Sequence, residues 1–352
     1  MSARSTFVVL RICTLANNTF SAIRVCPTHS AIIVKGGHLI SRPLCTEKTR
    51  AELPTANVTF KSLGVTFNAT YADAGDPKGP VIVCLHGAPA SHKDFAIISP
   101  YLLSAGVRLI APNFPGYGYC KVIDGDSYNF TVEHKAAFLK NLFEAIGVDR
   151  ISVLVSHSAS GATTGQFCAD TDLVQSVAFL SAINISRHNP ARYGRYFIGT
   201  GSWLMSNRII GKAMRKLLPP IAIKLSGFRV SDPGYMIGLV HEMAAVNWAK
   251  SIDNLKLMAK SPYPVLVIGC EEDKVVEVEI AKEKMKLFNI DRTEDVLYIN
   301  ADGVCTNVEK IENHKDKRRR GIIFAKGGHW IQNSHPEIIA MAILDLLKLV
   351  QK

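Results

Sequence analysis

The stretch VLVSHSASGATTGQF, from Val153 to Phe167, decides the fold because an apolar, β-like run breaks at a serine and continues as a helix. A tight strand-to-helix turn of this kind can present a serine hydroxyl to a base and to free backbone N–H donors. Ser158 is therefore the candidate nucleophile. A serine that only caps a helix N-terminus would give a similar local pattern, so the rest of the chain has to distinguish the two.

Two downstream segments supply candidate partners for this serine. Val265–Ile268 leads into an acidic loop that contains Asp273, and the segment RGIIFAKGGH ends at His329. A nucleophile, an acid and a histidine in this order, each after a strand, resemble the α/β-hydrolase superfamily. The resemblance implies that Ser158 is the nucleophile, His329 its base and Asp273 the group that holds the imidazole. His157 is expected to point away from bound substrate.

An upstream turn resembles a second motif of the same superfamily. In GPVIVCLHGAPASHKDF, a strand at Val81–Leu85 is followed by His-Gly-Ala-Pro, which is similar to the HGxP turn. The resemblance implies that the backbone N–H groups of Ala88 and Ala159 form the oxyanion hole, and that His86 supports the turn. Asn113, in NFPGYGYC, stands where the family's DxPGxG turn has an aspartate. That turn is structural, so the change leaves the functional prediction intact.

The motifs together predict an α/β-hydrolase fold, with a mostly parallel central sheet flanked by helices. We expect the domain over residues 55–352, with a helical cap at residues 185–262 inserted before the acid-bearing strand. The cap segment has little strand character and is rich in Arg, Lys, Met and aromatic residues. Its large apolar side chains are either walls of a substrate pocket or ordinary cap core. The pocket candidates are Tyr193, Tyr196, Phe197, Trp203, Met205 and Trp248.

Two positions leave alternatives open. Ser156 and Ser160 stand where the GxSxG pattern has glycines, which suit a turn that brings neighbouring chains close. Either the turn is slightly relaxed and active, or the fold has lost catalysis. Glu271 and Glu272 compete with Asp273 as the orienting acid, and the family register DxVV favours Asp273.

Residues 1–46 have the composition of a transit peptide, with five basic residues, many serines and threonines, and no acidic residue before Glu47. Arg11 interrupts the apolar run that a secretory signal would need. We expect a disordered segment that directs the protein to mitochondria, with a cytoplasmic location as the alternative. Secretion, which the Asn-x-Ser/Thr triplets at Asn57, Asn68, Asn129 and Asn184 would allow, is the less favoured interpretation, because the cysteines lack disulfide spacing.

The sequence predicts a serine hydrolase that cleaves a carboxylic ester, a thioester or a lipid-like acyl substrate through an acyl-enzyme. The alternative is a catalytically silent binding or scaffold protein with the same fold. No metal is expected, because no HExxH or CxxC spacing occurs. No cofactor is expected either, because the triad chemistry that the resemblance implies needs none. The expected partner is a small apolar acyl substrate, with peripheral contact with lipid as an open alternative. No nucleic acid is expected, because the basic run KDKRRR, which ends a second insertion at residues 301–320, is typical of a solvated loop. No membrane span is expected, because no run of about 18 apolar residues occurs. The sequence leaves the oligomeric state undetermined.

Overall fold

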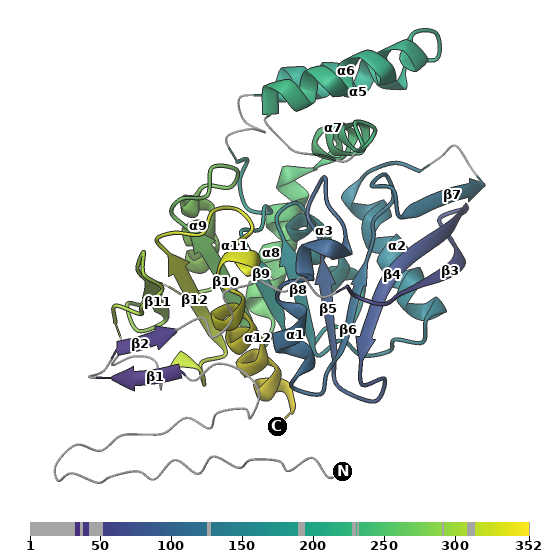
Figure 1. The fold of residues 1–352 in the computed structure, drawn as a ribbon. Coiled ribbons are helices and arrows are strands. Elements are labelled where there is room, and N and C mark those ends of the chain that lie inside the picture. The colour runs from purple at the N-terminus through teal and green to yellow at the C-terminus, as the bar shows by residue number, and fades with distance from the viewer. Residues whose placement is uncertain are drawn as a thin grey trace, which may run out of the picture.

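Parallel strands form the centre of a large sheet in this computed structural model, and helices cover both of its faces (Figure 1). The structure describes residues 32–35, 38–41, 52–124, 128–188, 194–226, 230, 232–290, 292–307 and 314–351. Within these residues the parallel strands follow the spatial order β11-β12-β10-β9-β8-β5-β6. They are β5 (Val81–Leu85), β6 (Arg108–Pro112), β8 (Val153–His157), β9 (Val177–Leu180), β10 (Val265–Cys270), β11 (Val296–Ile299) and β12 (Arg319–Phe324).

An antiparallel part extends the sheet beyond β6. The alternating residues that follow the N-terminal segment form a hairpin of β3 (Thr55–Ser62) and β4 (Val65–Gly75), as their period-two pattern predicts. β4 pairs with β6 and also with β7 (Cys120–Asp124). This mostly parallel sheet between helices confirms the predicted fold class.

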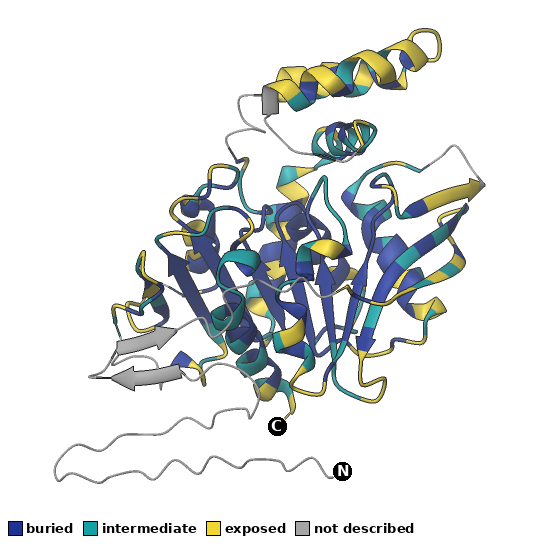
Figure 2. Ribbon diagram, viewed as in Figure 1, coloured by how far each residue is buried: buried dark blue, intermediate teal, exposed yellow. Residues whose placement is uncertain are grey.

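The central parallel strands are mostly apolar on both sides because helices cover both faces of the sheet. In β10, Val265 and Val267 pack into one hydrophobic cluster, while Leu266 and Ile268 pack into the cluster on the opposite face. The central strands β8, β9 and β10 are buried along their whole length, as Figure 2 shows. The first face carries α2 (Val132–Ala145), α3 (Ser160–Asp170), α8 (Trp248–Lys260) and α9 (Val278–Leu287). The second carries η1 (His92–Phe95), α1 (Ser99–Leu103), α11 (Ile331–Ser334) and α12 (Pro336–Gln351).

The segment at residues 185–262 is helical where it is described. Its first three helices, α5 (Arg195–Ser206), α6 (Gly211–Ser226) and α7 (Tyr235–Ala245), contact one another and lie above the sheet in Figure 1. The fourth helix, α8, returns to the sheet and packs against α3. The helices that stand away from the sheet are therefore α5 to α7, a smaller part of the segment than the sequence predicts as a cap.

The N-terminal segment is described only in part. Within residues 1–46 the structure gives the backbone of β1 (Ile32–Lys35) and β2 (His38–Ser41), which pair antiparallel. Two β-rich tetrapeptides around Gly-Gly are a hairpin signal, and here they depart from the expectation of a disordered segment. The other residues of the predicted transit peptide lie outside the described residues.

The end of the basic run KDKRRR is part of the sheet, which corrects the prediction of a solvated loop. Arg319 and Arg320 begin β12, and the Arg320 side chain is buried. Its guanidinium donates hydrogen bonds to the carbonyl groups of Lys315 and Ala342, among others. Because both terminal nitrogens of the guanidinium meet backbone carbonyls, this cation is buried without a carboxylate in hydrogen-bond contact among the described residues.

Candidate active site

The three side chains that the sequence predicts as a triad lie in hydrogen-bond contact. His329 Nε2 is 2.9 Å from Ser158 Oγ, and His329 Nδ1 is 2.9 Å from Asp273 Oδ2. Ser158 follows β8, Asp273 follows β10 and His329 follows β12, so all three lie at the carboxyl edge of the parallel strands. Each residue is buried. This arrangement allows the serine hydroxyl to give its proton to the imidazole while the carboxylate accepts from the other ring N–H.

The backbone at Ser158 has the strained conformation that a sharp strand-to-helix turn requires. Its φ angle is 55°, in the left-handed region that serine rarely adopts. Two backbone N–H groups hold the turn by donating to the Ser158 carbonyl, that of Gly161 at 3.1 Å and that of Ile183 at 2.9 Å. A Cβ atom on Gly87 would lie 2.7 Å from the Ser158 Cβ, so glycine is needed where the two turns meet.

The two serines that replace glycines are buried and hydrogen-bonded. Ser160 Oγ lies 2.8 Å from the His157 carbonyl oxygen and 3.0 Å from that of Leu85. Ser156 Oγ lies 3.1 Å from Ser160 Oγ. The turn therefore accommodates both hydroxymethyl groups, and Ser160 ties it to the end of β5. This geometry favours the relaxed-turn alternative over one in which the serines block the site.

Asp273 is held from two sides, which identifies it as the acid that contacts His329. Its Oδ1 accepts hydrogen bonds from the N–H groups of Val275 at 2.8 Å and Val276 at 2.9 Å. Burial alone would raise the pKa of Asp273, but the hydrogen bond and charge of His329, with these two amides, lower it overall. The carboxylate is therefore ionised where it faces the imidazole. Glu271 and Glu272, the competing candidates, are exposed.

Burial lowers the pKa of His329, and the hydrogen bond that its Nδ1–H donates to Asp273 offsets only part of this effect. The ring is therefore neutral near pH 7, as a general base must be. The Trp330 ring stands edge-on to it, with 5.2 Å between ring centroids. His157 lies behind it: His157 Nε2 is 3.1 Å from the His329 carbonyl oxygen, and Nδ1 is 3.6 Å from Asp94 Oδ2. His157 thus contacts the backbone of His329, and its orientation relative to bound substrate stays a prediction.

His86 joins the HGAP turn to the turn after β6. Its Nδ1–H donates to the Gly87 carbonyl at 2.6 Å, and its Nε2 accepts from the Phe114 N–H at 3.0 Å. Burial lowers the pKa of His86 to about 4, so the ring stays neutral and can both donate and accept. Asn113 is likewise structural, because its amide N–H donates to the Thr70 carbonyl at 2.6 Å. An ionised aspartate could not donate that hydrogen bond.

The amides proposed for the oxyanion hole lie on the two turns that meet at Ser158. Ala159 directly follows the serine, and Ala88 follows Gly87 at the end of β5, the strand that pairs with β8. Neither N–H donates a backbone hydrogen bond to another described residue. Both donors thus remain available near the serine hydroxyl, and their role stays a prediction.

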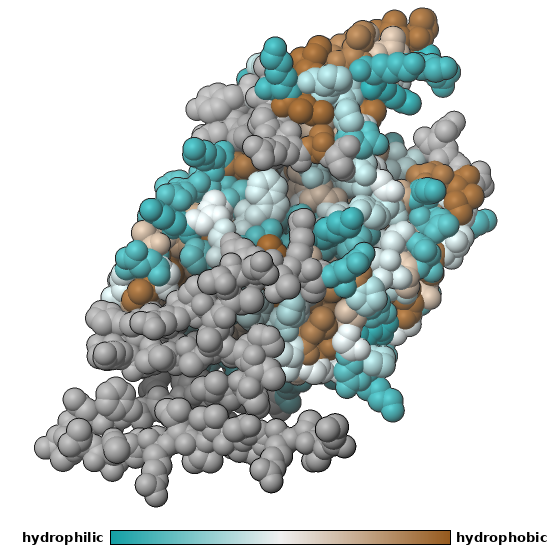
Figure 3. All heavy atoms as spheres, viewed as in Figure 1, coloured by the Kyte–Doolittle hydropathy of each residue, from teal (hydrophilic) through white to brown (hydrophobic). Residues whose placement is uncertain are grey.

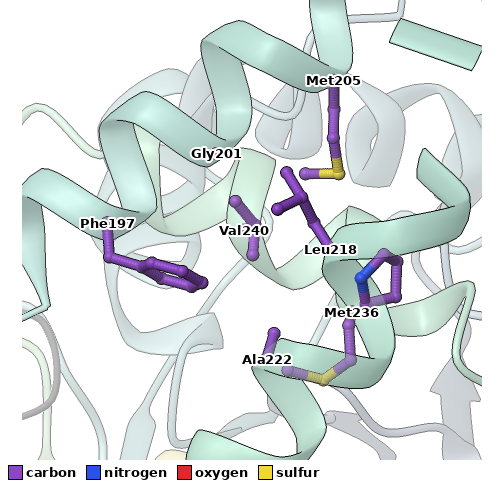
Figure 4. A pocket seen from close by; sticks show the side chains of 8 residues that line it. Phe197, Gly201, Met205, Leu218, Ala222, Met236 and Val240 are labelled. Atoms are coloured by element: carbon purple, nitrogen blue, oxygen red, sulfur yellow. The ribbon is translucent and has the colours of Figure 1, made fainter. Parts of the chain in front are cut away.

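The predicted pocket residues are dispersed. Phe197 and Met205 line a small apolar cavity between α5, α6 and α7 (Figure 4). At about 10 Å³ this cavity holds one water molecule at most, which is too small for an acyl group. Tyr196 and Trp203 are exposed on α5, whereas Trp248 packs against Ile183 and Val276 beside the acid loop. Tyr193 lies outside the described residues. The role of these residues in binding substrate stays a prediction.

Sequence reasoning missed His188, a buried histidine in the loop after β9. Burial, with a smaller effect from the charge of His329, lowers its pKa to about 4, and the charge of Asp273 acts in the opposite direction. Its Nδ1 has no hydrogen-bond partner among the described residues. No motif marks this position. The only signal is a histidine at the start of the inserted segment.

A buried ionic contact ties α7 to the body of the molecule, and it too was missed. Glu242 Oε1 accepts from Lys135 Nζ at 2.6 Å, and Glu242 Oε2 accepts from the Tyr117 hydroxyl at 2.5 Å. The Lys135 and Glu242 side chains are only 3% and 4% exposed. This contact fixes α7 over the turn that follows β6. Across the described ranges, no group of three or more His, Cys, Asp or Glu residues is placed to hold a metal ion.

Comparison with known proteins agrees with this architecture. Residues 51–348 match the protein family described as alpha/beta hydrolase of unknown function (DUF1057). This chain belongs to that family. Solved structures that share the fold of this alpha/beta hydrolase include esterases and haloalkane dehalogenases.

Three proteins illustrate the range of similarity. The chain is 22% identical over 321 residues to the uncharacterized protein F35H12.5 of Caenorhabditis elegans, covering 83% of this chain and 86% of that protein. It is 26% identical over 230 residues to the bifunctional esterase/perhydrolase DCH of Acinetobacter calcoaceticus, covering 61% and 82% of the two chains. A thermophilic esterase from Thermogutta terrifontis superposes with a TM-score of 0.59 at 18% identity, covering 84% of this alpha/beta hydrolase and 100% of that chain.

Proposed function

We propose that this alpha/beta hydrolase is a serine hydrolase that cleaves a carboxylic ester, a thioester or a lipid-like acyl substrate. The observation that carries the proposal is the continuous chain of hydrogen bonds from Ser158 through His329 to Asp273. A serine on a left-handed turn, next to a neutral buried imidazole, is the arrangement that activates a hydroxyl for attack on a carbonyl carbon.

The reaction would proceed in two halves. In the first, Ser158 Oγ attacks the substrate carbonyl carbon and His329 Nε2 takes the hydroxyl proton. The proton then passes to the leaving alcohol or thiol as its bond to the acyl carbon breaks, which leaves an acyl-serine ester. In the second, His329 takes a proton from water as the water oxygen attacks the acyl carbon, and the imidazolium then returns that proton to Ser158 Oγ as the acyl-serine bond breaks and the carboxylic acid leaves. Asp273 holds the imidazole in the tautomer with its proton on Nδ1 and stabilises the imidazolium.

Negative charge develops on the carbonyl oxygen in both halves of the reaction. The N–H groups of Ala88 and Ala159 would donate to it, because they lie on the two turns that converge on Ser158. Losing one such donor typically reduces turnover about 10²–10³-fold. Backbone donors also explain why alanine suffices at both positions.

Hydrolysis of short p-nitrophenyl esters tests this proposal. The purified full chain should release p-nitrophenol, and Ser158→Ala should lose about 10⁴–10⁶-fold in turnover. A matched control is Ser104→Ala, which removes an exposed hydroxyl at the end of α1. Activity that survives in Ser158→Ala would assign the reaction to another residue.

A catalytically silent binding protein is the second candidate, because Ser156 and Ser160 replace the glycines of the usual turn. In that case the folded protein would be inert toward esters, and the double change Ser156→Gly with Ser160→Gly would be needed to gain activity. Hydrolysis by the unchanged protein would exclude this candidate.

We propose a mitochondrial location from the acid-free, arginine-containing composition of residues 1–46. A tagged full-length protein should colocalise with mitochondria, and its mature N-terminus should lie near Arg42–Lys48. Glycosylated protein in the secretory pathway would contradict this proposal.

A further inference from the structure

Exposed apolar side chains gather on the helices that stand away from the sheet. Of the thirteen large apolar residues that are exposed in the described part of the chain, seven fall within residues 196–221. Figure 3 shows hydrophobic and hydrophilic side chains interleaved at this end of the molecule, over α5 and α6. We call these two helices and their connecting turn the α5–α6 surface. Its exposed apolar residues are Tyr196, Phe197, Trp203, Ile209, Ile210, Leu217 and Ile221.

The turn between the two helices holds two isoleucines in contact with solvent. Ile209 is 91% exposed, and Ile210 is 40% exposed. The Asn207 side-chain oxygen accepts from the backbone N–H of Ile209 at 2.9 Å and from that of Ile210 at 3.2 Å. This side-chain cap fixes the turn, so the isoleucines project because the backbone is held there. Exposed isoleucine side chains do not stabilise the fold, so their position suggests that another molecule covers them.

The charge of the α5–α6 surface has one sign only. No Asp or Glu occurs between Asp172 and Asp232, whereas α5, α6 and their turn carry six exposed basic residues. None of the six takes part in an ion pair with a described residue, although exposed lysines elsewhere do. The six are Arg195, Arg208, Lys212, Arg215, Lys216 and Lys224.

We propose that the α5–α6 surface docks onto an anionic lipid bilayer. Exposed Trp, Ile and Leu with interspersed Lys and Arg and no acid are the composition of helices that lie in a membrane interface. The apolar groups enter the boundary between headgroups and acyl chains, and the cations meet the anionic headgroups. No helix among the described residues is long and apolar enough to cross a membrane, so the contact is a peripheral one.

A second copy of this chain fits the surface less well. A two-fold dimer through the α5–α6 surface would place six cations against six cations, with no acid in the segment to pair them. Nucleic acid would satisfy the cations but would leave Ile209 in water. The inference goes beyond the proposed hydrolase function and does not depend on it, because it concerns binding alone.

Sedimentation with lipid vesicles tests the charge part of the proposal. The full chain should bind vesicles of phosphatidylcholine mixed with phosphatidylserine more tightly than vesicles of phosphatidylcholine alone. Lys212→Glu with Lys216→Glu should weaken that binding about 30-fold or more, given the contribution of each basic residue near an anionic surface. The matched control, Lys140→Glu with Lys286→Glu, makes the same charge change on exposed positions of α2 and α9. The basic N-terminal segment is present in all three proteins, so it cannot account for a difference between the variants.

The apolar part is tested by tryptophan emission. Trp203 is 64% exposed, so its emission should shift to shorter wavelength when anionic vesicles are added, and Trp203→Phe should lose that shift. Ile209→Ser with Ile210→Ser should weaken binding about tenfold or more. The control with Ile123→Ser and Leu257→Ser, which removes comparably exposed apolar groups elsewhere, should not.

Three outcomes would overturn the proposal. If the two charge variants lose binding equally, the attraction is a property of net charge and not of the α5–α6 surface. If the bound protein shows no shift of Trp203 emission, the membrane contact lies elsewhere. If the protein ignores vesicles but forms a dimer that the Ile209 and Ile210 substitutions dissociate, a second copy covers the surface.

Discussion

Glu242→Gln should destabilise the protein by about 3–5 kcal/mol, the usual cost of removing one partner from a buried ion pair. The Lys135 and Glu242 side chains are 3% and 4% exposed, with 2.6 Å between Nζ and Oε1. The glutamine would leave the Lys135 ammonium in a dry environment without its counter-charge. The Tyr117 hydroxyl, which also donates to Glu242, would retain an acceptor. Most of the expected loss is therefore the cost of the unpaired charge.

The chain supplies a matched control for this prediction. Glu133 and Lys250 also join α2 to the 185–262 segment, at 2.8 Å, but their side chains are 40% and 44% exposed. Glu133→Gln should cost less than about 1 kcal/mol, because water screens exposed pairs. Equilibrium unfolding in urea, followed by circular dichroism, gives both free energies of unfolding. Lys135→Met combined with Glu242→Gln should cost much less than the sum of the two single changes. If Glu242→Gln costs no more than Glu133→Gln, or if the effects of the two single changes add, the buried pair does not carry the stability assigned to it.

Three further predictions concern the proposed catalysis. Asp273→Asn should cripple ester hydrolysis in a folded protein, whereas Glu271→Gln should leave it nearly unchanged; the reverse pattern in steady-state kinetics would assign the acid to the glutamate. Because burial lowers the pKa of His329 from its ordinary 6.5, the imidazole stays unprotonated to lower pH. The loss of kcat/KM on the acid side should therefore have its midpoint below pH 6.5. A midpoint above pH 6.5 would contradict the buried position of His329. Ser160→Gly, which removes hydroxyl contacts with two backbone carbonyls, should change kcat less than about tenfold; a large gain would instead mean that the serine obstructs the turn.

The sequence predicted the elements whose local pattern is sufficient to define them. The apolar run at Val153–Val155 lies in a strand buried on both faces, and such strands read as continuous apolar stretches. The close approach of Ser158, Asp273 and His329 followed from chain order and the resemblance, because the carboxyl ends of parallel strands share one edge.

What the sequence did not predict depends on contacts between distant segments. In the sequence, Glu242 is a single acidic residue in an apolar helix. Its burial is possible because it pairs with Lys135, which is 107 residues away. Arg320 reads as part of a solvated basic run, yet backbone carbonyls from two segments satisfy its guanidinium. Trp203 reads as a pocket wall, because composition does not distinguish the inner face of α5 from its exposed face. In each case the position of the side chain depends on residues that are distant in the sequence.

The most direct test of the account is covalent labelling of the purified full chain with a fluorophosphonate probe, followed by mass spectrometry of the labelled peptide. The probe phosphorus takes the place of the substrate carbonyl carbon, so only a serine activated by a base reacts rapidly. We expect a single rapidly labelled residue, Ser158, with labelling lost in Ser158→Ala and retained in Ser104→Ala. A folded protein that stays unlabelled, or equal labelling of Ser158→Ala, would contradict it.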